Sequence, residues 1–176
     1  MFITVVSDNA PNDVMSAWNF QLQIAAITGT GSLTFQDPVT GTPSNPANYV
    51  FGSNGLGILA TNGGTTLSAN DFFNPAAGPG AAVPGTPGAN LLQMDFLASP
   101  TASALFGIYA VEGAANTQWT DSNATTRFFT NVPDGTDMVE IGEVMVVPNA
   151  VPEPSTFWVF GLGGVAFAGW EWWRKR

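Results

Sequence analysis

The sequence predicts an all-β protein whose body is a single β-sandwich, and three observations support this prediction. Apolar and polar residues alternate along residues 14–27, which is the period of two expected for a half-buried strand. Further short apolar stretches follow, most of them flanked by Gly, Pro, Asn or Asp. The 176 residues include 20 Gly and 13 Pro, so turn-forming residues are frequent. Many short strands separated by turns are typical of sandwiches.

The strand over residues 14–27 is the best defined. Its apolar face carries Trp18, Phe20, Leu22 and Ile24, and its polar face carries Asn19, Gln21 and Gln23. Residues 1–6 precede it as a first strand. The glycines at 29 and 31 predict a turn into residues 32–35, so that 14–27 and 32–35 form a hairpin.

The remaining strands are expected at 48–51, 56–60, 91–97, 104–111, 126–131 and 139–147. Residues 104–111 are apolar on both faces, which favours a central position in the sheet. Residues 36–47 and 74–90 are rich in Pro and are expected to be surface loops. We expect a single domain over residues 1–148, because two halves of roughly 70 residues would each bury only a marginal core.

The C-terminal residues have a different pattern. Residues 149–156 form a Pro-containing linker, residues 157–173 are apolar except for Glu171, and residues 174–176 are Arg174-Lys175-Arg176. A helix over 157–173 would rise roughly 25 Å against a hydrocarbon core of about 30 Å. This length predicts a transmembrane helix whose basic tip stays in the cytoplasm. A buried core helix and a plain, unprocessed membrane anchor are the alternatives.

These segments resemble the PEP-CTERM sorting tail of exosortase substrates. The resemblance rests on the segment Val151, Pro152, Glu153 and Pro154, the Gly-rich apolar run, and the terminal cluster Arg174, Lys175 and Arg176, in that order. It implies export, an inner-membrane intermediate held by residues 157–173, recognition by an exosortase, and delivery to the cell surface or an exopolysaccharide matrix.

Two other features concern the N-terminal part of the chain. Residues 1–8 have no basic region followed by a long apolar stretch, so they do not read as a signal peptide, and we expect the natural start to lie upstream. Residues 13–24 resemble the first strands of cohesin-like, immunoglobulin-type sandwiches. The expected body is therefore a sandwich of jelly-roll or immunoglobulin/cohesin-like type.

Charge and composition exclude several classes of function. Residues 1–156 contain one basic residue, Arg127, and twelve carboxylates, so nucleic acid is not an expected partner. Because the chain has no His and no Cys, it cannot form a Ser-His-Asp triad, a Cys-His pair or a histidine-ligated zinc site. A pair of carboxylates remains for hydrolysis. Glu140 and Glu143 would act together only if Gly142 introduces a bulge.

Two kinds of ligand site are considered. Oxygen-rich turns occur at residues 8–13, 121–123 and 134–137, and Asp134 and Asp137 are the candidate calcium ligands, although the same residues form ordinary turns without metal. Trp119 lies in a polar stretch and is the candidate glycan contact, with a loop Trp that covers the sandwich end as the alternative. No other cofactor is expected.

The sequence thus predicts an exported, non-enzymatic surface or exopolysaccharide-matrix protein. A carbohydrate-binding or adhesion module is the first alternative. A surface filament or layer of identical subunits, assembled with calcium, is another, and an extracellular hydrolase is the third.

Overall fold

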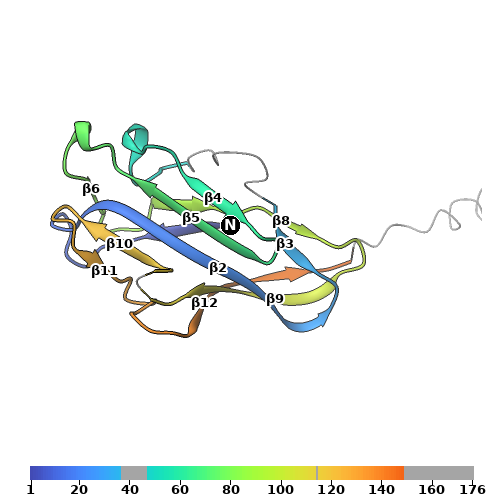
Figure 1. The fold of residues 1–176 in the computed structure, drawn as a ribbon. Helices are drawn as coiled ribbons and strands as arrows, with labels where there is room; N and C mark the ends of the chain where they lie inside the picture. Colours follow the sequence, from blue (N-terminus) through green and yellow to red (C-terminus); the bar gives the residue numbers. More distant parts are fainter. Residues whose placement is uncertain (37–46, 114, 149–176) are drawn as a thin grey trace, which may run out of the picture.

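The computed structural model describes residues 1–36, 47–113 and 115–148, and within them the protein is built from β-strands (Figure 1). The strands are β1 (Phe2–Val5), β2 (Val14–Thr30), β3 (Leu33–Phe35), β4 (Leu59–Asn62), β5 (Thr66–Phe72), β6 (Ala81–Ala82), β7 (Ala89–Gln93), β8 (Phe96–Ala98), β9 (Ser103–Val111), β10 (Gln118–Asp121), β11 (Thr126–Arg127) and β12 (Met138–Val146). Two 3₁₀ turns, η1 (Gly52–Asn54) and η2 (Pro75–Ala77), lie between them. The all-β prediction is confirmed.

The strands form a large sheet that faces two small ones. Eight strands make the large sheet, in the order β11-β10-β2-β5-β4, with β6 and β9 also paired to β2 and β12 paired to β9. The pairs β1-β7 and β3-β8 are the two small sheets. Side chains from all three sheets share one hydrophobic core, among them Phe20, Phe106, Leu33 and Leu92, so the arrangement is sandwich-like.

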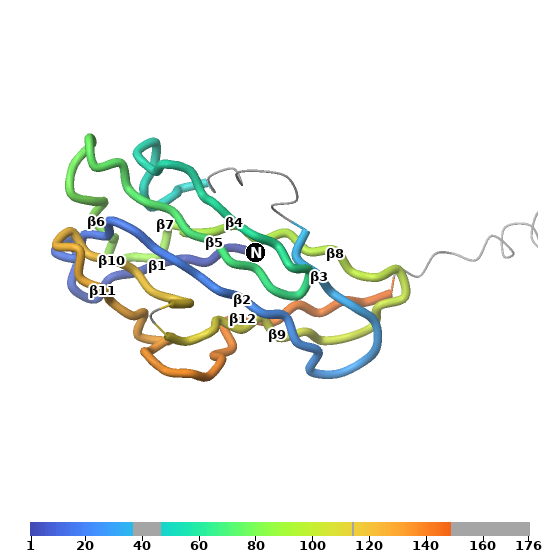
Figure 2. Tube along the Cα trace, viewed as in Figure 1, coloured from blue at the N-terminus to red at the C-terminus, as the bar shows by residue number. Residues whose placement is uncertain are grey.

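Strand β2 is the centre of the large sheet (Figure 2). Ala17 pairs with Phe72 of β5 and with Thr120 of β10, and these partners must lie on opposite edges of β2. Leu22 likewise pairs with both β5 and β9, so β10 and β9 follow one another along the same edge. The apolar face predicted for this strand is confirmed, because Trp18, Phe20, Leu22 and Ile24 are all buried.

Strand β9 is central as predicted, since it pairs with β2 on one side and with β12 on the other. The β9-β12 register shifts between Glu140 and Gly142, which leaves Ile141 as the extra residue of a bulge on β12. At the other end of β9, Gly29 adopts a φ of +91°, and a Cβ there would collide with the backbone of Ser103. This glycine lets the two strands approach closely.

Several strand predictions were wrong. Strand β3 pairs with β8 and does not form a hairpin with β2. The Gly pair specified a turn correctly, but Leu33 and Phe35 are buried, and burial across the core decided their partner. Residues 91–97 divide into β7 and β8, and β11 covers only two residues of the predicted 126–131. Residues 48–51 contribute one isolated bridge, Tyr49 to Asn90.

Three strands were missed, namely β5, β6 and β10. The alternation in β5 is present, since Leu67 and Ala69 are buried, but its inward set continues with Asp71. Because this inward position holds a carboxylate, the alternation of apolar and polar residues is interrupted, and the strand was not recognised from the sequence. Its burial requires partners within the core.

Those partners are the Tyr49 phenol and the backbone N–H of Phe72, and the Trp18 indole in turn bonds to the phenol. Tyr49 donates a hydrogen bond to Asp71 Oδ2 at 2.5 Å, and Trp18 Nε1 donates to the Tyr49 hydroxyl at 3.0 Å. The second carboxylate oxygen of Asp71 accepts the N–H of Phe72 at 2.7 Å. Asp71 is 1% exposed, so this chain of bonds, here called the Trp18-Tyr49-Asp71 network, lies inside the core.

Replacing Tyr49 by Phe should lower the free energy of unfolding by about 2 kcal/mol, because the substitution leaves a buried carboxylate oxygen and the Trp18 N–H without a partner. Urea unfolding at neutral pH measures the loss. Tyr109→Phe, which changes the other tyrosine of the chain, is the matched control and should cost less. Equal losses in the two variants would contradict the importance of the network.

The same residue should make stability depend on pH. Burial, together with the hydrogen bond to Asp71, raises the pKa of Tyr49 well above its ordinary value of 10.0. The folded state then holds this proton more tightly than the unfolded state, so stability is complete below about pH 10 and falls as the pH rises further. In Tyr49→Phe the alkaline decrease in unfolding free energy should be smaller. If the unfolding free energy of Tyr49→Phe fell with alkaline pH as steeply as that of the natural chain, this role of Tyr49 would be contradicted.

Candidate functional site

A polar pocket of about 400 Å³ lies at one end of the sandwich, and we call it the end pocket. One wall is the loop between β1 and β2, and the other is the hairpin formed by β10 and β11, which Figure 1 places at the same end of the molecule. The lining residues are Asn9, Asn12, Asp13, Val14, Trp119, Asp121, Ser122, Asn123, Arg127 and Phe128. The sole basic residue of residues 1–156 therefore lines this pocket.

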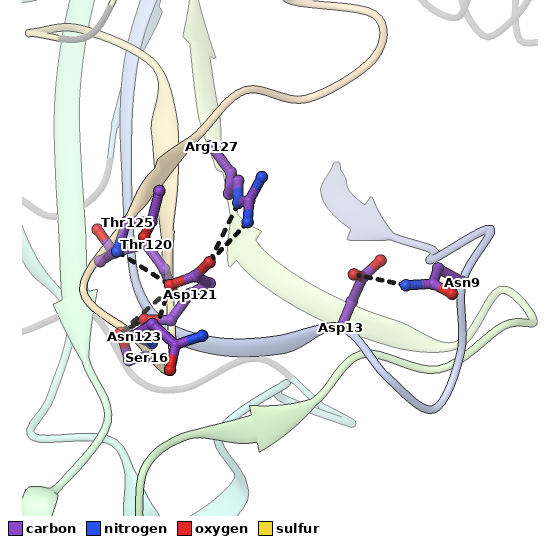
Figure 3. Close-up of polar contacts among 8 residues, drawn as sticks. All are labelled: Asn9, Asp13, Ser16, Thr120, Asp121, Asn123, Thr125 and Arg127. Atoms are coloured by element: carbon purple, nitrogen blue, oxygen red, sulfur yellow. Dashed lines mark hydrogen bonds and ion pairs between the residues drawn. The ribbon is translucent and has the colours of Figure 1, made fainter.

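Asp121 organises the hairpin wall (Figure 3). Its Oδ1 accepts the N–H groups of Asn123 and Thr125, both at 2.9 Å, which closes the turn between β10 and β11. Its Oδ2 accepts from Arg127 Nε at 3.1 Å and Nη2 at 3.0 Å. The hydrogen bond from the Thr125 N–H is the main cause that lowers the pKa of Asp121, with Asn123 and the Arg127 guanidinium adding to it.

The hairpin is also tied to the central strand. Ser16 donates from its hydroxyl to the carbonyl oxygens of Thr120 and Asp121, at 3.2 and 2.8 Å. Ala124 completes the turn with a φ of 59°, in the left-handed region. The guanidinium is thus held at a fixed position, while its side chain remains 55% exposed and faces solvent.

Asp13 holds the opposite wall of the pocket, which is the loop between β1 and β2. Asp13 accepts the Ser7 hydroxyl at 2.5 Å and the Asn9 amide at 3.4 Å. Asn12 donates to Asn9 Oδ1 at 3.3 Å. Figure 3 shows Asp13 and Asn9 on one side and Asp121 and Arg127 on the other. Two of the oxygen-rich turns noted in the sequence therefore meet at one pocket.

Trp119 lies on β10 opposite Trp18, and directly opposed residues of an antiparallel pair project to the same face. Its indole is therefore on the core side of the sheet, where it is partly buried and packs against the core. Part of its surface lines the end pocket. The pocket thus combines an aromatic wall with amide, carboxylate and guanidinium groups, a composition suited to a small polar ligand with an apolar face.

The candidate calcium ligands Asp134 and Asp137 lie elsewhere, in the turn before β12, and both are exposed. That turn is bound to Glu112, whose Oε2 accepts the Asp137 N–H at 3.2 Å and whose N–H donates to the Asp137 carbonyl at 2.9 Å. Gly135 packs so closely on Glu112 that a Cβ would collide with the carboxylate. In the described ranges no cluster of three or more acidic side chains has a metal-binding arrangement.

Glu140 and Glu143 are brought to one face by the bulge at Ile141. They pair with Tyr109 and Gly107, which are two residues apart on β9 and therefore face the same side. Burial raises the pKa of Tyr109, and its hydrogen bond to Glu140 and the charge of Glu143 add to this effect. The bulge that the carboxylate pair requires is present, on the outer face of the large sheet.

The sorting motif lies outside the described residues, as does the expected helix over 157–173. Within the described ranges, no helix has the length and hydrophobicity needed to cross a bilayer. The fold and pocket define a class: an acidic all-β domain with a polar pocket at one end.

Comparison with known protein families identifies the C-terminal segment of the chain. Residues 150–175 match the model of the PEP-CTERM protein-sorting motif, so the chain carries this motif, and the motif implies exosortase-dependent export. No curated protein and no solved structure matches the chain. The resemblance of the tail to the PEP-CTERM sorting motif is confirmed. The transmembrane helix over 157–173 and the cohesin-like resemblance of the body stay predictions.

The sequence analysis identified Trp119 and the oxygen-rich turns at 8–13 and 121–123 as candidate sites, but it did not predict that they lie together. It also did not consider Arg127 as a site residue. The composition of the sequence could have indicated Arg127. In a segment with one basic residue among twelve carboxylates, that residue is a candidate for a specific contact.

Replacing Asp121 by Asn should loosen the hairpin and leave Arg127 without its carboxylate partner. Because the folded pKa of Asp121 is lowered, its contribution to stability is complete above about pH 4 and is lost as the pH falls further. The variant should therefore lose less stability on acidification than the natural chain. Asp95→Asn is the matched control. Identical acid profiles for Asp121→Asn and the natural chain would contradict the prediction.

Proposed function

We propose that this chain is a non-enzymatic protein of the cell surface or exopolysaccharide matrix, delivered there by exosortase. The observation that carries the proposal is the PEP-CTERM motif at residues 150–175. The composition of the body agrees with it. A domain with one basic residue in residues 1–156 and a net charge of −9 for the whole chain stays soluble outside the cell and attracts cations.

The true termini of the protein test the sorting step. In the native host, mass spectrometry of the surface and extracellular fractions should find a mature chain that ends near Pro154. Glu153→Ala should leave the full-length chain in the membrane fraction, because it alters the segment by which such tails are recognised. Ser155→Ala, a neighbouring change outside the Pro-Glu-Pro segment, is the control. A surface-located chain that still ends in Arg174-Lys175-Arg176 would contradict processing.

A second candidate, a carbohydrate-binding module, is favoured by the end pocket. Pyranose rings have apolar faces and hydroxyl edges, and the pocket offers an indole beside amide, carboxylate and guanidinium groups. Arg127 retains exposed N–H donors beyond those bound to Asp121. The position of both walls is fixed before any ligand binds, which lowers the entropic cost of binding.

A glycan array tests this candidate. Trp119→Ala should weaken the binding of a captured glycan by roughly tenfold or more, because truncating a central aromatic typically costs about 2 kcal/mol. Trp119→Phe should retain part of the affinity. Phe72→Ala, which removes a 52% exposed aromatic ring from β5, is the control and should leave binding unchanged. Equal binding by the natural chain and Trp119→Ala would remove the pocket as the site.

A further inference from the structure

We propose that the free edge of β1 takes up an extended peptide strand from another protein, one that carries apolar residues at alternate positions and Lys or Arg between them. The site is separate from the end pocket and does not depend on glycan binding. It rests on a second hollow in the structure, a groove of about 700 Å³ that we call the side groove.

The side groove runs along an open side of the sandwich. All six consecutive residues from 1 to 6 line it. Since neighbouring residues of a strand point to opposite faces, a hollow lined by an unbroken run must lie against the edge of that strand. Across the groove, Val139, Glu140 and Ile141 of β12 are also consecutive, so the edge of this strand faces the groove as well.

Both edges lack a strand partner among the described residues. There β1 pairs with β7 alone and β12 pairs with β9 alone. Such edges expose a row of backbone N–H and C=O groups to an incoming strand. The floor of the groove is apolar, with Phe20, Leu91 and Val132 among its lining residues. An extended peptide can therefore bond to an edge and bury every second side chain.

The two edges are not equally available. Strand β12 carries the bulge at Ile141 and the exposed Glu140 within its groove-lining part, and both features oppose strand addition. The β1-β7 register also shifts, between Ile3 and Thr4, but the extra residue is Leu91 of β7. Strand β1 is itself regular and has no charged side chain. The edge of β1 is the one suited to pairing.

The charge of the protein selects the partner. Glu140 lines the groove, and the adjoining hollow of about 140 Å³ adds Asp8. A second copy of this chain would bring twelve further carboxylates and one Arg from residues 1–156, and the two copies would repel each other. A strand with Lys or Arg at its outward positions is attracted instead. This contrast assigns the occupant to a different, basic protein segment.

The full chain in mild detergent can be tested with a synthetic probe, acetyl-(Val-Lys)₄-amide. We expect binding by fluorescence anisotropy, and slower hydrogen exchange at the β1 amides when the probe is present. A version N-methylated at alternate residues cannot donate along one edge and should lose binding. The probe acetyl-(Val-Glu)₄-amide should not bind. Equal binding by the N-methylated probe would show a purely ionic contact and overturn the proposal.

Matched variants locate the site. Phe2→Lys and Val6→Lys, at groove residues that are 47% and 48% exposed, should abolish binding, whereas Leu59→Lys, at a 60% exposed residue of β4, should not. Glu140→Gln should weaken binding roughly two- to fivefold, as expected for one exposed charge pair, and Glu143→Gln, whose residue does not line the groove, should change it less. Equal effects of the paired variants would overturn the location.

Two further outcomes would overturn the choice of occupant. Sedimentation that shows dimers of the natural chain, lost in Phe2→Lys, would mean that a second copy covers β1. Protection of the β1 amides before any probe is added, in a monomer, would mean that another segment of this chain occupies the edge.

Discussion

The Trp18-Tyr49-Asp71 network is the constraint on which the rest of the body depends. It places a carboxylate inside the core, where a phenol and one backbone N–H bond to it and an indole bonds to the phenol. Trp18 belongs to β2, Asp71 to β5, and Tyr49 bridges to Asn90 of β7. The network thus connects the middle of the large sheet with the facing layer. A buried charge tolerates little displacement of its partners, so these three segments have one relative position.

Because β2 is long, its two ends pair with different strands and so position different surfaces of the body. Its first residues pair with β10 and hold the end-pocket hairpin, while its later residues pair with β9, which in turn holds β12. Strand β2 therefore contributes to both hollows, through Val14 in the end pocket and Phe20 in the side groove, while the edge of β1 belongs to the small β1-β7 sheet. The end pocket places Arg127 among carboxylate and amide groups, whereas the side groove is mostly apolar and follows the uncharged strand β1.

The sorting motif is encoded by the order of residues along the chain, whereas the body depends on contacts between distant segments. The tail is defined by the order of a Pro-Glu-Pro segment, an apolar run and a basic end along the chain, and this order can be read without any contact to the body. The body has no comparable linear signal, and its surfaces come from strands far apart in sequence. Trp18, for instance, pairs with Trp119 across about a hundred residues. The sorting motif and the surfaces of the body can therefore change independently of each other.

Reading the amino-acid sequence was enough to predict the all-β class, the core face of β2, the central place of β9 and the sorting motif. Each of these follows from local periodicity or from residue order. The folded structure was needed to establish that β3 pairs with β8, that β5 contains a buried aspartate, and that the turns at 8–13 and 121–123 line one pocket with Trp119. Strand partners and buried polar bonds depend on segments distant in the chain. A turn signal records that the backbone reverses, but the burial of Leu33 and Phe35 across the core selects what it meets.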